Sequence, residues 1–550
     1  MVRYRVNIIL IFLFLIWSII VGQLFKLQIL ESDFYQALAQ GQQRKQSLIG
    51  TRGEIFFKSG EFLASNNVVF HVFATPSNIT NKQETANLLK DILLIDEEII
   101  LERLNRSSSF VYLKKDLSEQ ERTLLTQEKI PGIDIETELI RQYLNGPMAS
   151  QVIGFLGGEG IGQYGLEGLY DEVLRPQEAV PKWGLAGQLL GLETKQTNGA
   201  NIYLTLDYNI QFIAERLLEQ AYQKYNIESG SLIVINPKTG AILALANFPN
   251  FDPNFYHQET NFQIFKNPVI QRIFEPGSIF KVFTLAAALD QKKINPETEY
   301  EDKGFIQIGG YTLKNYNERV FGRTNMVDVL ERSINTGAIF AQRQLGNQAF
   351  LDYLEKFGFF ELTGIDLHGE IFSQNLEFKK GYEVNFATAS YGQGINITLI
   401  QALRAFTALA NDGRMVKPYI VDKINQNKTE PVFSSPVISS QTASQTTAMM
   451  VSVIENGFSK KAKIPGYYLA GKTGTSQVPY SSLGIDKRGY SNKTWQTFIG
   501  FGPAFDPEFM ILVKLDNPAT NTAEYSAMPV FRDMAKYLID YLKIPPDYDI

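Results

Sequence analysis

The most apolar stretch of the chain lies at its N-terminus. Residues 6–25 read VNIILIFLFLIWSIIVGQLF, with polar side chains at Asn7, Ser18 and Gln23. A helix of twenty residues spans about 30 Å, the thickness of the hydrocarbon core of a bilayer. Arg3 and Arg5 precede this run, so the positive-inside rule places residues 1–5 in the cytoplasm. The pattern predicts a single-pass transmembrane anchor at 6–25, with the rest of the chain outside the cytoplasm.

A cleaved signal peptide is the alternative interpretation of this run. Such a peptide has a shorter apolar core and small residues at its cleavage site. Here Gly22 is followed by the bulky stretch Gln23-Leu24-Phe25-Lys26-Leu27. An uncleaved anchor is therefore favoured.

The region 26–200 has mixed local patterns. Strand-like runs occur at 68–74 and 110–113, and apolar residues recur at helical spacing over 81–104. The glycine-rich stretch 154–168 predicts tight turns. It contains Gly160-x-Gly162-x-x-Gly165, which matches a dinucleotide fingerprint, but no clear βαβ unit surrounds it. We predict a non-catalytic domain here and no nucleotide site.

A second domain is predicted from residue 201 to residue 550. Strand-like runs at 201–206, 231–236, 241–246, 467–475, 497–502 and 509–515 alternate with helical patterns at 208–225, 278–288, 326–345, 399–410 and 530–542. The turn sequence Pro237-Lys238-Thr239-Gly240 separates two of these strands and predicts an antiparallel hairpin. The fold class is therefore α+β, an antiparallel sheet packed by helices.

Composition narrows the chemistry. The chain has a formal net charge of −6, so it has no general electrostatic attraction for nucleic acid. It contains no cysteine, which excludes disulfides and thiolate chemistry. Its only imidazoles, His71, His257 and His368, are scattered and do not have metal-ligand spacing. A Ser-His-Asp triad would require these lone residues to meet in space.

Ser278 and Lys281 are the first candidate catalytic pair. Pro276-Gly277 interrupts the chain, and the apolar run IFKVFTLAAAL then predicts a helix with Ser278 in its first turn. Lys281 lies three residues on, on the same face. A serine hydroxyl needs an adjacent base, and lysine can be that base only if burial or a nearby cation lowers its pKa. The non-catalytic alternative is a serine that caps the helix beside a lysine that is solvated.

Two further motifs follow in the chain. Ser333-Ile334-Asn335 lies 55 residues after Ser278, and Lys472-Thr473-Gly474-Thr475 lies 139 residues after Ser333. The second motif is on a predicted strand, whose edge could offer N–H groups to an extended peptide. A second copy, Lys238-Thr239-Gly240, falls in the predicted hairpin turn and is interpreted as structural.

The ordered triplet S-x-x-K, S-x-N, K-T-G resembles that of penicillin-binding proteins and serine β-lactamases. The chain also resembles class B, monofunctional penicillin-binding proteins outside these motifs. The matching segments are Arg52-Gly53-Glu54, Arg141-x-Tyr143, Gly165-Leu166-Glu167, Tyr391-Gly392-Gln393-Gly394 and Gly500-Phe501-Gly502-Pro503. Leu144 departs from the family, which usually has proline there. The resemblance covers nearly the whole chain.

This resemblance implies a peptidoglycan D,D-transpeptidase, of the cell-division type by a weak preference, with a serine β-lactamase-like catalytic domain. Ser278 would be the nucleophile, Lys281 its base, Ser333 a proton relay, and Asn335 a ligand of the substrate amide that also fixes Lys281. Lys472, Thr473, Gly474 and Thr475 would bind the terminal carboxylate. The implied ligands are stem peptides and β-lactams, and the implied partner is a multi-span lipid II polymerase. No metal or cofactor is implied.

Several alternatives remain open at this point. A D,D-carboxypeptidase or a β-lactamase uses the same triplet, and the long non-catalytic region speaks against the latter. A β-lactam sensor normally has a cytoplasmic module, for which residues 1–5 leave no room. An elongation-type transpeptidase and a non-catalytic scaffold of the wall-synthesis complex are the others, and the scaffold predicts lost motif residues.

Overall fold

The computed structural model describes residues 50–177 and 197–549, together with residues 13, 14, 16–18, 20–24 and 26. The chain forms two compact units. Of the described residues from 50 onward, the smaller contains 50–52, 66–140, 176–177 and 197–199, and the larger contains 53–65, 141–175 and 200–549. The predicted non-catalytic domain, 26–200, therefore contributes two stretches to the larger unit. Half of the predicted anchor, 6–25, lies outside the described residues, among which there is no helix long and apolar enough to cross a membrane.

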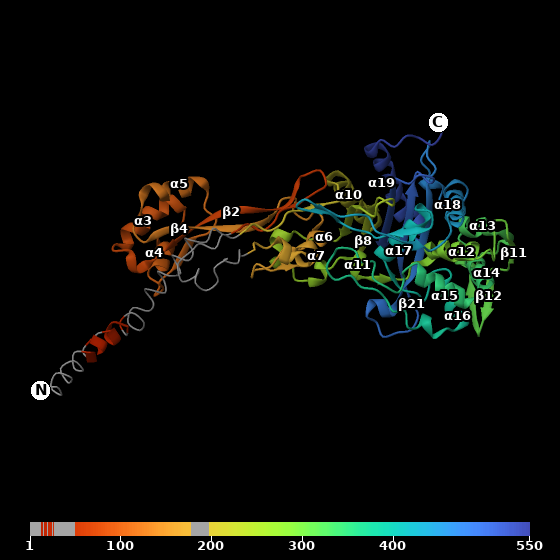
Figure 1. Cartoon of the computed structure of the whole chain (residues 1–550), viewed down its shortest axis with the longest axis horizontal. Coiled ribbons are helices and arrows are strands. Elements are labelled where there is room, and N and C mark those ends of the chain that lie inside the picture. The colour runs from red at the N-terminus through yellow and green to blue at the C-terminus, as the bar shows by residue number, and fades with distance from the viewer. Residues whose placement is uncertain are drawn as a thin grey trace, which may run out of the picture. The chain divides into compact units, whose positions relative to one another are not determined.

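The smaller unit packs three helices on a small antiparallel sheet (Figure 1). Its strands are the later part of β2 (Phe62–Ala74), β3 (Val111–Lys114) and β4 (Ile133–Tyr143). Its helices are α3 (Lys82–Leu93), α4 (Glu97–Leu104) and α5 (Glu119–Glu128). The strands predicted at 68–74 and 110–113 are confirmed. The single helix predicted over 81–104 is wrong in one respect, because Leu94 adopts a left-handed backbone (φ +55°) and splits it.

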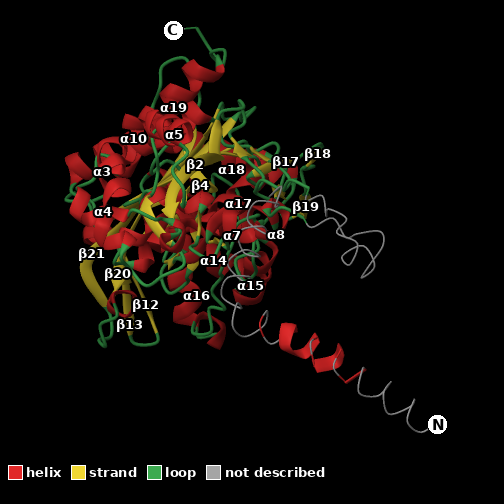
Figure 2. Cartoon of the chain, turned by 90° about the vertical axis from the view of Figure 1, so that its left-hand side faces the viewer, coloured by secondary structure: helices red, strands yellow, loops and turns green. Residues whose placement is uncertain are grey.

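A five-stranded antiparallel sheet forms the centre of the larger unit. Its strand order is β20-β21-β22-β8-β9, so β20 is an edge strand. The five strands are β20 (Ala470–Pro479), β21 (Tyr490–Gly502), β22 (Phe509–Asp516), β8 (Ser229–Ile235) and β9 (Ile242–Phe248). β20 and β21 lie side by side in Figure 2. The α+β class and the predicted antiparallel hairpin are confirmed, with Lys238-Thr239-Gly240 at the turn between β8 and β9.

Helices cover both faces of this sheet because alternate strand residues are apolar on each face. One face packs against α10 (Tyr208–Tyr225) and α19 (Ala527–Leu542). The other face lies against the apolar cluster of the helices around the candidate site, of which those at 399–410 and 440–455 contact the strands of the sheet (Figure 1). The helices around the site are α11 (Pro268–Gln271), α12 (Lys281–Asp290), α13 (Met326–Glu331), α14 (Asn335–Leu345), α15 (Asn347–Lys356), α16 (Glu383–Ala389), α17 (Leu399–Ala410) and α18 (Ser440–Glu455).

Short strands complete the larger unit. β1 (Ile55–Phe56) pairs in parallel with β7 (Ile202–Leu204), which also pairs with β17 (Val421–Ile424). The remaining strands are β5 (Phe155–Leu156), β6 (Gly162–Gln163), β10 (Ile273–Phe274), β11 (Glu299–Asp302), β12 (Phe305–Ile308), β13 (Tyr311–Lys314), β14 (Gly322–Asn325), β15 (Ile397–Thr398), β16 (Arg414–Val416), β18 (Asn427–Lys428) and β19 (Phe433–Pro436).

The glycine-rich stretch of the larger unit forms tight turns, as predicted. β5 and β6 are antiparallel and lead into the short helix α7 (Gly165–Leu169), so the Gly160-x-Gly162-x-x-Gly165 run does not lie in a βαβ unit. Gly165 has φ +43°, and a Cβ atom there would meet the Val152 carbonyl oxygen at 2.3 Å. The last glycine therefore serves close packing against α6 (Ser150–Ile153), and α8 (Asp171–Leu174) follows.

Three residues of the family-like segments form one buried cluster beside α7. Arg141 donates from Nε to Glu167 Oε1 at 2.7 Å, and the Tyr143 hydroxyl donates to the same oxygen at 3.3 Å. The side chains of Arg141 and Glu167 are 3% and 0% exposed. A buried ion pair is sensitive to loss of one partner, since the remaining charge is left uncompensated.

Glu167→Ala should therefore lower the free energy of unfolding by about 3 kcal/mol, measured by urea denaturation. The matched control is Glu299→Ala, which removes an exposed ion pair with Arg323 and should change the value by less than about 1 kcal/mol. Equal effects of the two substitutions would contradict the structural importance of the buried cluster.

Candidate active site

The three sequence motifs converge in the larger unit. Ser278 lies in a short 3₁₀ turn, η5 (Gly277–Phe280), that leads directly into α12. Ser333 occupies the break between α13 and α14, and Lys472 lies on the edge strand β20. The helix predicted at 278–288 thus begins as a 3₁₀ turn, and the one predicted over 326–345 is two helices. Ser333 has φ +56°, a backbone that cannot continue an α-helix.

Lys281 is fully buried at the start of α12, with 0% exposure. Its Nζ donates to the Ser333 carbonyl oxygen at 2.5 Å and lies 3.2 Å from the Ser333 hydroxyl. Burial removes the solvation of the ammonium, and the nearby Lys472 cation repels it, so the pKa of Lys281 lies well below its usual value. The lowered pKa favours the neutral amine, which can accept a proton.

Lys472 is the second buried lysine of the site, with 1% exposure. Its Nζ donates to the Ser333 hydroxyl at 3.1 Å and to the Thr473 carbonyl at 3.2 Å. Burial lowers the pKa of Lys472 to about 7. Both lysine nitrogens therefore meet at one hydroxyl, which has two lone pairs to accept from them. The hydroxyl of Ser333 connects the two amines in a chain along which a proton can move.

The nucleophile candidate is half-buried and next to this chain. Within residues 197–549, Lys281 donates to Ser333 and makes no hydrogen bond to the Ser278 hydroxyl. In resting enzymes, such catalytic hydrogen bonds are often long and tighten when substrate binds. The geometry therefore brings Ser278, Lys281, Ser333 and Lys472 together without completing the proton path.

The other predicted residues lie at the same site but make different contacts from those expected. Asn335 donates from Nδ2 to the Lys314 carbonyl at 2.9 Å rather than to Lys281. Thr475 Oγ1 accepts from the Ala523 backbone N–H at 3.1 Å, and Thr473 Oγ1 lies 3.4 Å from Lys472 Nζ. The two threonines are half-buried and alternate with buried neighbours along β20.

Glycines allow the turn with Ser278 to approach β20. A Cβ atom on Gly474 would meet the Pro276 carbonyl oxygen at 2.8 Å, and one on Gly277 would meet the Thr475 carbonyl oxygen at 3.1 Å. Gly277 also has φ +58°, which side chains rarely adopt. A side chain at Gly474 would push the two elements apart, and one at Gly277 would strain the turn.

Sequence reasoning missed one buried carboxyl beside the nucleophile. Glu275 is 4% exposed and accepts from the Gly394 N–H and the Tyr490 hydroxyl. Burial raises the pKa of Glu275 to about 7, although these hydrogen bonds oppose the shift. The one indication of it in the sequence is a glutamate between Phe274 and Pro276, among otherwise apolar residues just before Ser278.

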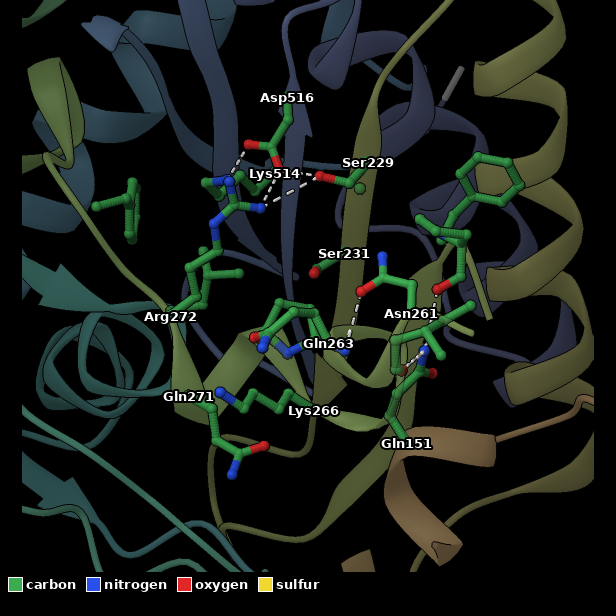
Figure 3. A pocket seen from close by; sticks show the side chains of 17 residues that line it. Gln151, Ser229, Ser231, Asn261, Gln263, Lys266, Gln271, Arg272, Lys514 and Asp516 are labelled. Atoms are coloured by element: carbon green, nitrogen blue, oxygen red, sulfur yellow. Dashed lines mark hydrogen bonds and ion pairs between the residues drawn. The ribbon is translucent and has the colours of Figure 1, made fainter. Parts of the chain in front are cut away.

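A pocket of about 470 Å³ lies elsewhere on the larger unit and contains none of the predicted site residues. Figure 3 shows Asp516 against Lys514 and Arg272 in its wall. Burial alone would raise the pKa of Asp516, but the two cations lower it below its usual value. The pocket also has Lys266 and the amides of Gln151, Asn261 and Gln263 in its lining. Its polarity is accounted for by this ion cluster and these amides.

Burial of Lys281 should reduce the stability of the folded protein at neutral pH. In the unfolded chain this lysine stays protonated up to about pH 10.5, whereas in the folded protein its pKa is well below that value. Between the two pKa values the unfolded state therefore binds more protons, and the stability of the folded state rises with pH. Lys281→Met should abolish acylation yet give a Tm at pH 7 equal to or above that of the unmodified protein, with the difference shrinking toward pH 10. A Tm well below the unmodified value at pH 7 would contradict the assignment.

Comparison with known proteins adds independent findings. The family model described as the penicillin-binding protein transpeptidase domain matches residues 230–536, and that described as the penicillin-binding protein dimerisation domain matches residues 47–204. Stage V sporulation protein D of Bacillus subtilis is 31% identical over 535 residues, covering 94% of this chain and 82% of that protein. Peptidoglycan D,D-transpeptidase FtsI of Buchnera aphidicola is 29% identical, covering 92% and 89%.

Solved structures agree with these sequence relatives. Penicillin-binding protein 3 of Mycobacterium tuberculosis, in its complex with aztreonam, superposes with a TM-score of 0.70 at 26% identity. The match covers 91% of this chain and 98% of that one. Penicillin-binding protein 2X of Streptococcus thermophilus superposes with a TM-score of 0.75, also at 26% identity, covering 90% and 81%.

Proposed function

Because the chain belongs to the penicillin-binding protein transpeptidase family, we propose that it is a septal peptidoglycan D,D-transpeptidase that acts through a Ser278 acyl-enzyme. The single observation that carries this proposal is the meeting of two buried lysines at the Ser333 hydroxyl, next to Ser278. This arrangement supplies a neutral amine where a serine nucleophile needs a base. Relatives named as peptidoglycan D,D-transpeptidases supply the substrate class.

The first half of the reaction acylates the enzyme. Ser278 Oγ attacks the carbonyl carbon of the penultimate D-Ala of a donor stem peptide, and Lys281 Nζ takes the hydroxyl proton. The amide C–N bond then breaks, and the terminal D-Ala leaves after receiving a proton through Ser333. Backbone N–H groups of Ser278 and Thr475 stabilise the oxyanion, a contribution of roughly 3 kcal/mol per donor in other acyl-transfer enzymes.

The second half releases the acyl group to an acceptor. An amine of a second stem peptide attacks the ester carbonyl, forming the cross-linking amide, and the Ser278 oxygen leaves as a hydroxyl with the returned proton. Water in place of this amine would give a carboxypeptidase. β-Lactams acylate the same serine, and this is consistent with the aztreonam complex of the mycobacterial relative.

Substrate binding uses the edge strand. β20 has a free edge on which an extended peptide can add as a further strand. Lys472, Thr473 and Thr475 hold the terminal carboxylate, and Gly474 keeps β20 close to the turn with Ser278. Asn335 binds the substrate amide. To do so, its side chain must break the hydrogen bond that it donates to the Lys314 carbonyl.

The membrane placement is also part of the proposal. The apolar run at 6–25 anchors the protein with residues 1–5 in the cytoplasm and the catalytic domain, 201–550, outside the cytoplasm at the plasma membrane. Residues 26–200 act as a pedestal, and a multi-span lipid II polymerase is the partner at the membrane. The match to the dimerisation-domain family over residues 47–204 supports a role in protein contacts for this region.

Labelling with a fluorescent penicillin tests the nucleophile. The unmodified protein should form a stable covalent adduct, and Ser278→Ala should form none, because the attacking oxygen is removed. Incubation of the unmodified protein with donor and acceptor peptides should then release D-Ala together with the cross-linked product. Equal labelling of Ser278→Ala would assign the nucleophile elsewhere, and hydrolysis without cross-linking would favour the carboxypeptidase.

The pH dependence of penicillin acylation tests the charge states of the two lysines. The acylation rate constant should reach its plateau well below pH 10.5, since burial and Lys472 keep Lys281 neutral there. The ratio of this constant to the dissociation constant should fall above about pH 7, because Lys472 then loses the proton that attracts the carboxylate. A rate that rises only near pH 10.5 would show that Lys281 titrates as an ordinary lysine.

A further inference from the structure

Glu275 lies where three elements near the candidate nucleophile meet. It precedes Pro276-Gly277-Ser278, and its side chain is almost completely buried. Its Oε1 accepts from the Gly394 N–H at 3.1 Å, and its Oε2 accepts from the Tyr490 hydroxyl at 3.1 Å. Its backbone carbonyl accepts from the Ser476 hydroxyl at 2.7 Å. One residue thus contacts the 391–394 loop, β20 and β21.

These contacts close a ring around the turn with Ser278. Gly277 N–H donates to the Gly392 carbonyl at 3.0 Å, only two residues before the Gly394 N–H that Glu275 accepts. A Cβ atom on Gly392 would meet the Gly277 carbonyl oxygen at 2.1 Å, so the loop lies directly against the turn. The ring is continuous from the loop, through Glu275, to the two strands.

The position of this ring matters because the two N–H groups that would donate hydrogen bonds to the oxyanion come from different elements. Ser278 N–H belongs to η5, and Thr475 N–H belongs to β20. No covalent connection fixes the distance between them, and an error of about 1 Å in such a site costs about 10²-fold in rate. Ser476, the residue after Thr475, is the residue of β20 that donates to Glu275. Tyr490 opposes Pro479 at the far end of the same strand pair.

We propose that Glu275 is a positioning residue that sets the separation of Ser278 and Thr475, by binding the Ser278 turn to the 391–394 loop, to Ser476 and to Tyr490. The inference rests on the proposed acyl-transfer function. Glu275 acts through its hydrogen bonds and not through its charge, and it exchanges no proton with the substrate. The ionisable groups that face it are the phenols of Tyr391 and Tyr490, whose pKa values are raised first by burial and then by this carboxyl.

Three variants separate this role from others. Glu275→Ala removes the side-chain acceptors. Glu275→Gln keeps both contacts, because its oxygen can accept from Gly394 and its amide N–H can donate to the Tyr490 oxygen. Tyr490→Phe removes one hydroxyl from a side chain that is 37% exposed, so it leaves the fold intact if Glu275→Ala does not. Tyr480→Phe is the matched control, since that hydroxyl contacts Lys487 on the same hairpin and not Glu275.

The measurements are the acylation rate constant and the dissociation constant for a fluorescent penicillin, with Tm for each variant. Glu275→Ala should acylate about 10²-fold more slowly with the dissociation constant nearly unchanged. Glu275→Gln and Tyr480→Phe should stay within about 3-fold of the unmodified rate. Tyr490→Phe should be slower than Tyr480→Phe, and adding it to Glu275→Ala should cause no further loss, because both act through one ring.

Several results would overturn the inference. These are a folded Glu275→Ala that acylates at the unmodified rate, a Glu275→Gln as slow as Glu275→Ala, or additive losses in the double variant. A Glu275→Ala that does not fold leaves the decision to Tyr490→Phe, whose rate must then differ from that of Tyr480→Phe. If the unmodified protein forms no adduct, the proposed function fails and this inference falls with it. An adduct with unaltered Glu275→Ala kinetics rejects the inference alone.

Discussion

The site depends on one constraint, the removal of the Lys281 ammonium from water beside a second buried lysine. An isolated charge in such a place is strongly disfavoured, and the group responds by losing its proton. Packing alone lowers this pKa, because α12 is apolar around Lys281 and Lys472 approaches from β20. Ser333 Oγ is the acceptor that both nitrogens need. The same burial that lowers the pKa of Lys281 lowers the stability of the folded state, so reactivity and stability are coupled at this residue.

The backbone around the lysines is organised to permit this packing. Gly474 lets η5 and β20 approach closely, because a Cβ atom there would meet the Pro276 carbonyl oxygen at 2.8 Å, and Gly277 permits the left-handed backbone of the turn (φ +58°). Ser333 holds a left-handed backbone (φ +56°), which ends α13 and turns its hydroxyl and carbonyl toward Lys281. Backbone strain of this kind persists only where the surroundings enforce it, and at functional sites it fixes the position of a side chain. Ser333 thus shapes the backbone and contacts both lysines at the same position.

Much of this arrangement was predictable from sequence, and the exceptions have physical causes. α10 and α17 match their predicted ranges, 208–225 and 399–410, because their apolar spacing is regular and Asp207 and Thr398 cap them. The breaks at Leu94 and Ser333 were missed because neither residue is a usual helix breaker. α18 was missed because its first half is rich in serine, threonine and glutamine. The motif residues were found by order and spacing, whereas the partners of Glu275 are at positions 394, 476 and 490, and no local pattern connects them.

The charge of Lys281 in the resting folded protein decides whether this lysine can act as the base. Nitrogen NMR of the lysine side chains in ¹⁵N-labelled protein reads this directly, because an amine and an ammonium have distinct Nζ shifts, and Lys281→Met identifies the signal. At pH 8 the Lys281 signal should be that of an amine, and it should not titrate near pH 10.5, the usual pKa of lysine. An ammonium signal for Lys281 at pH 8, titrating near pH 10.5, would contradict its role as the base.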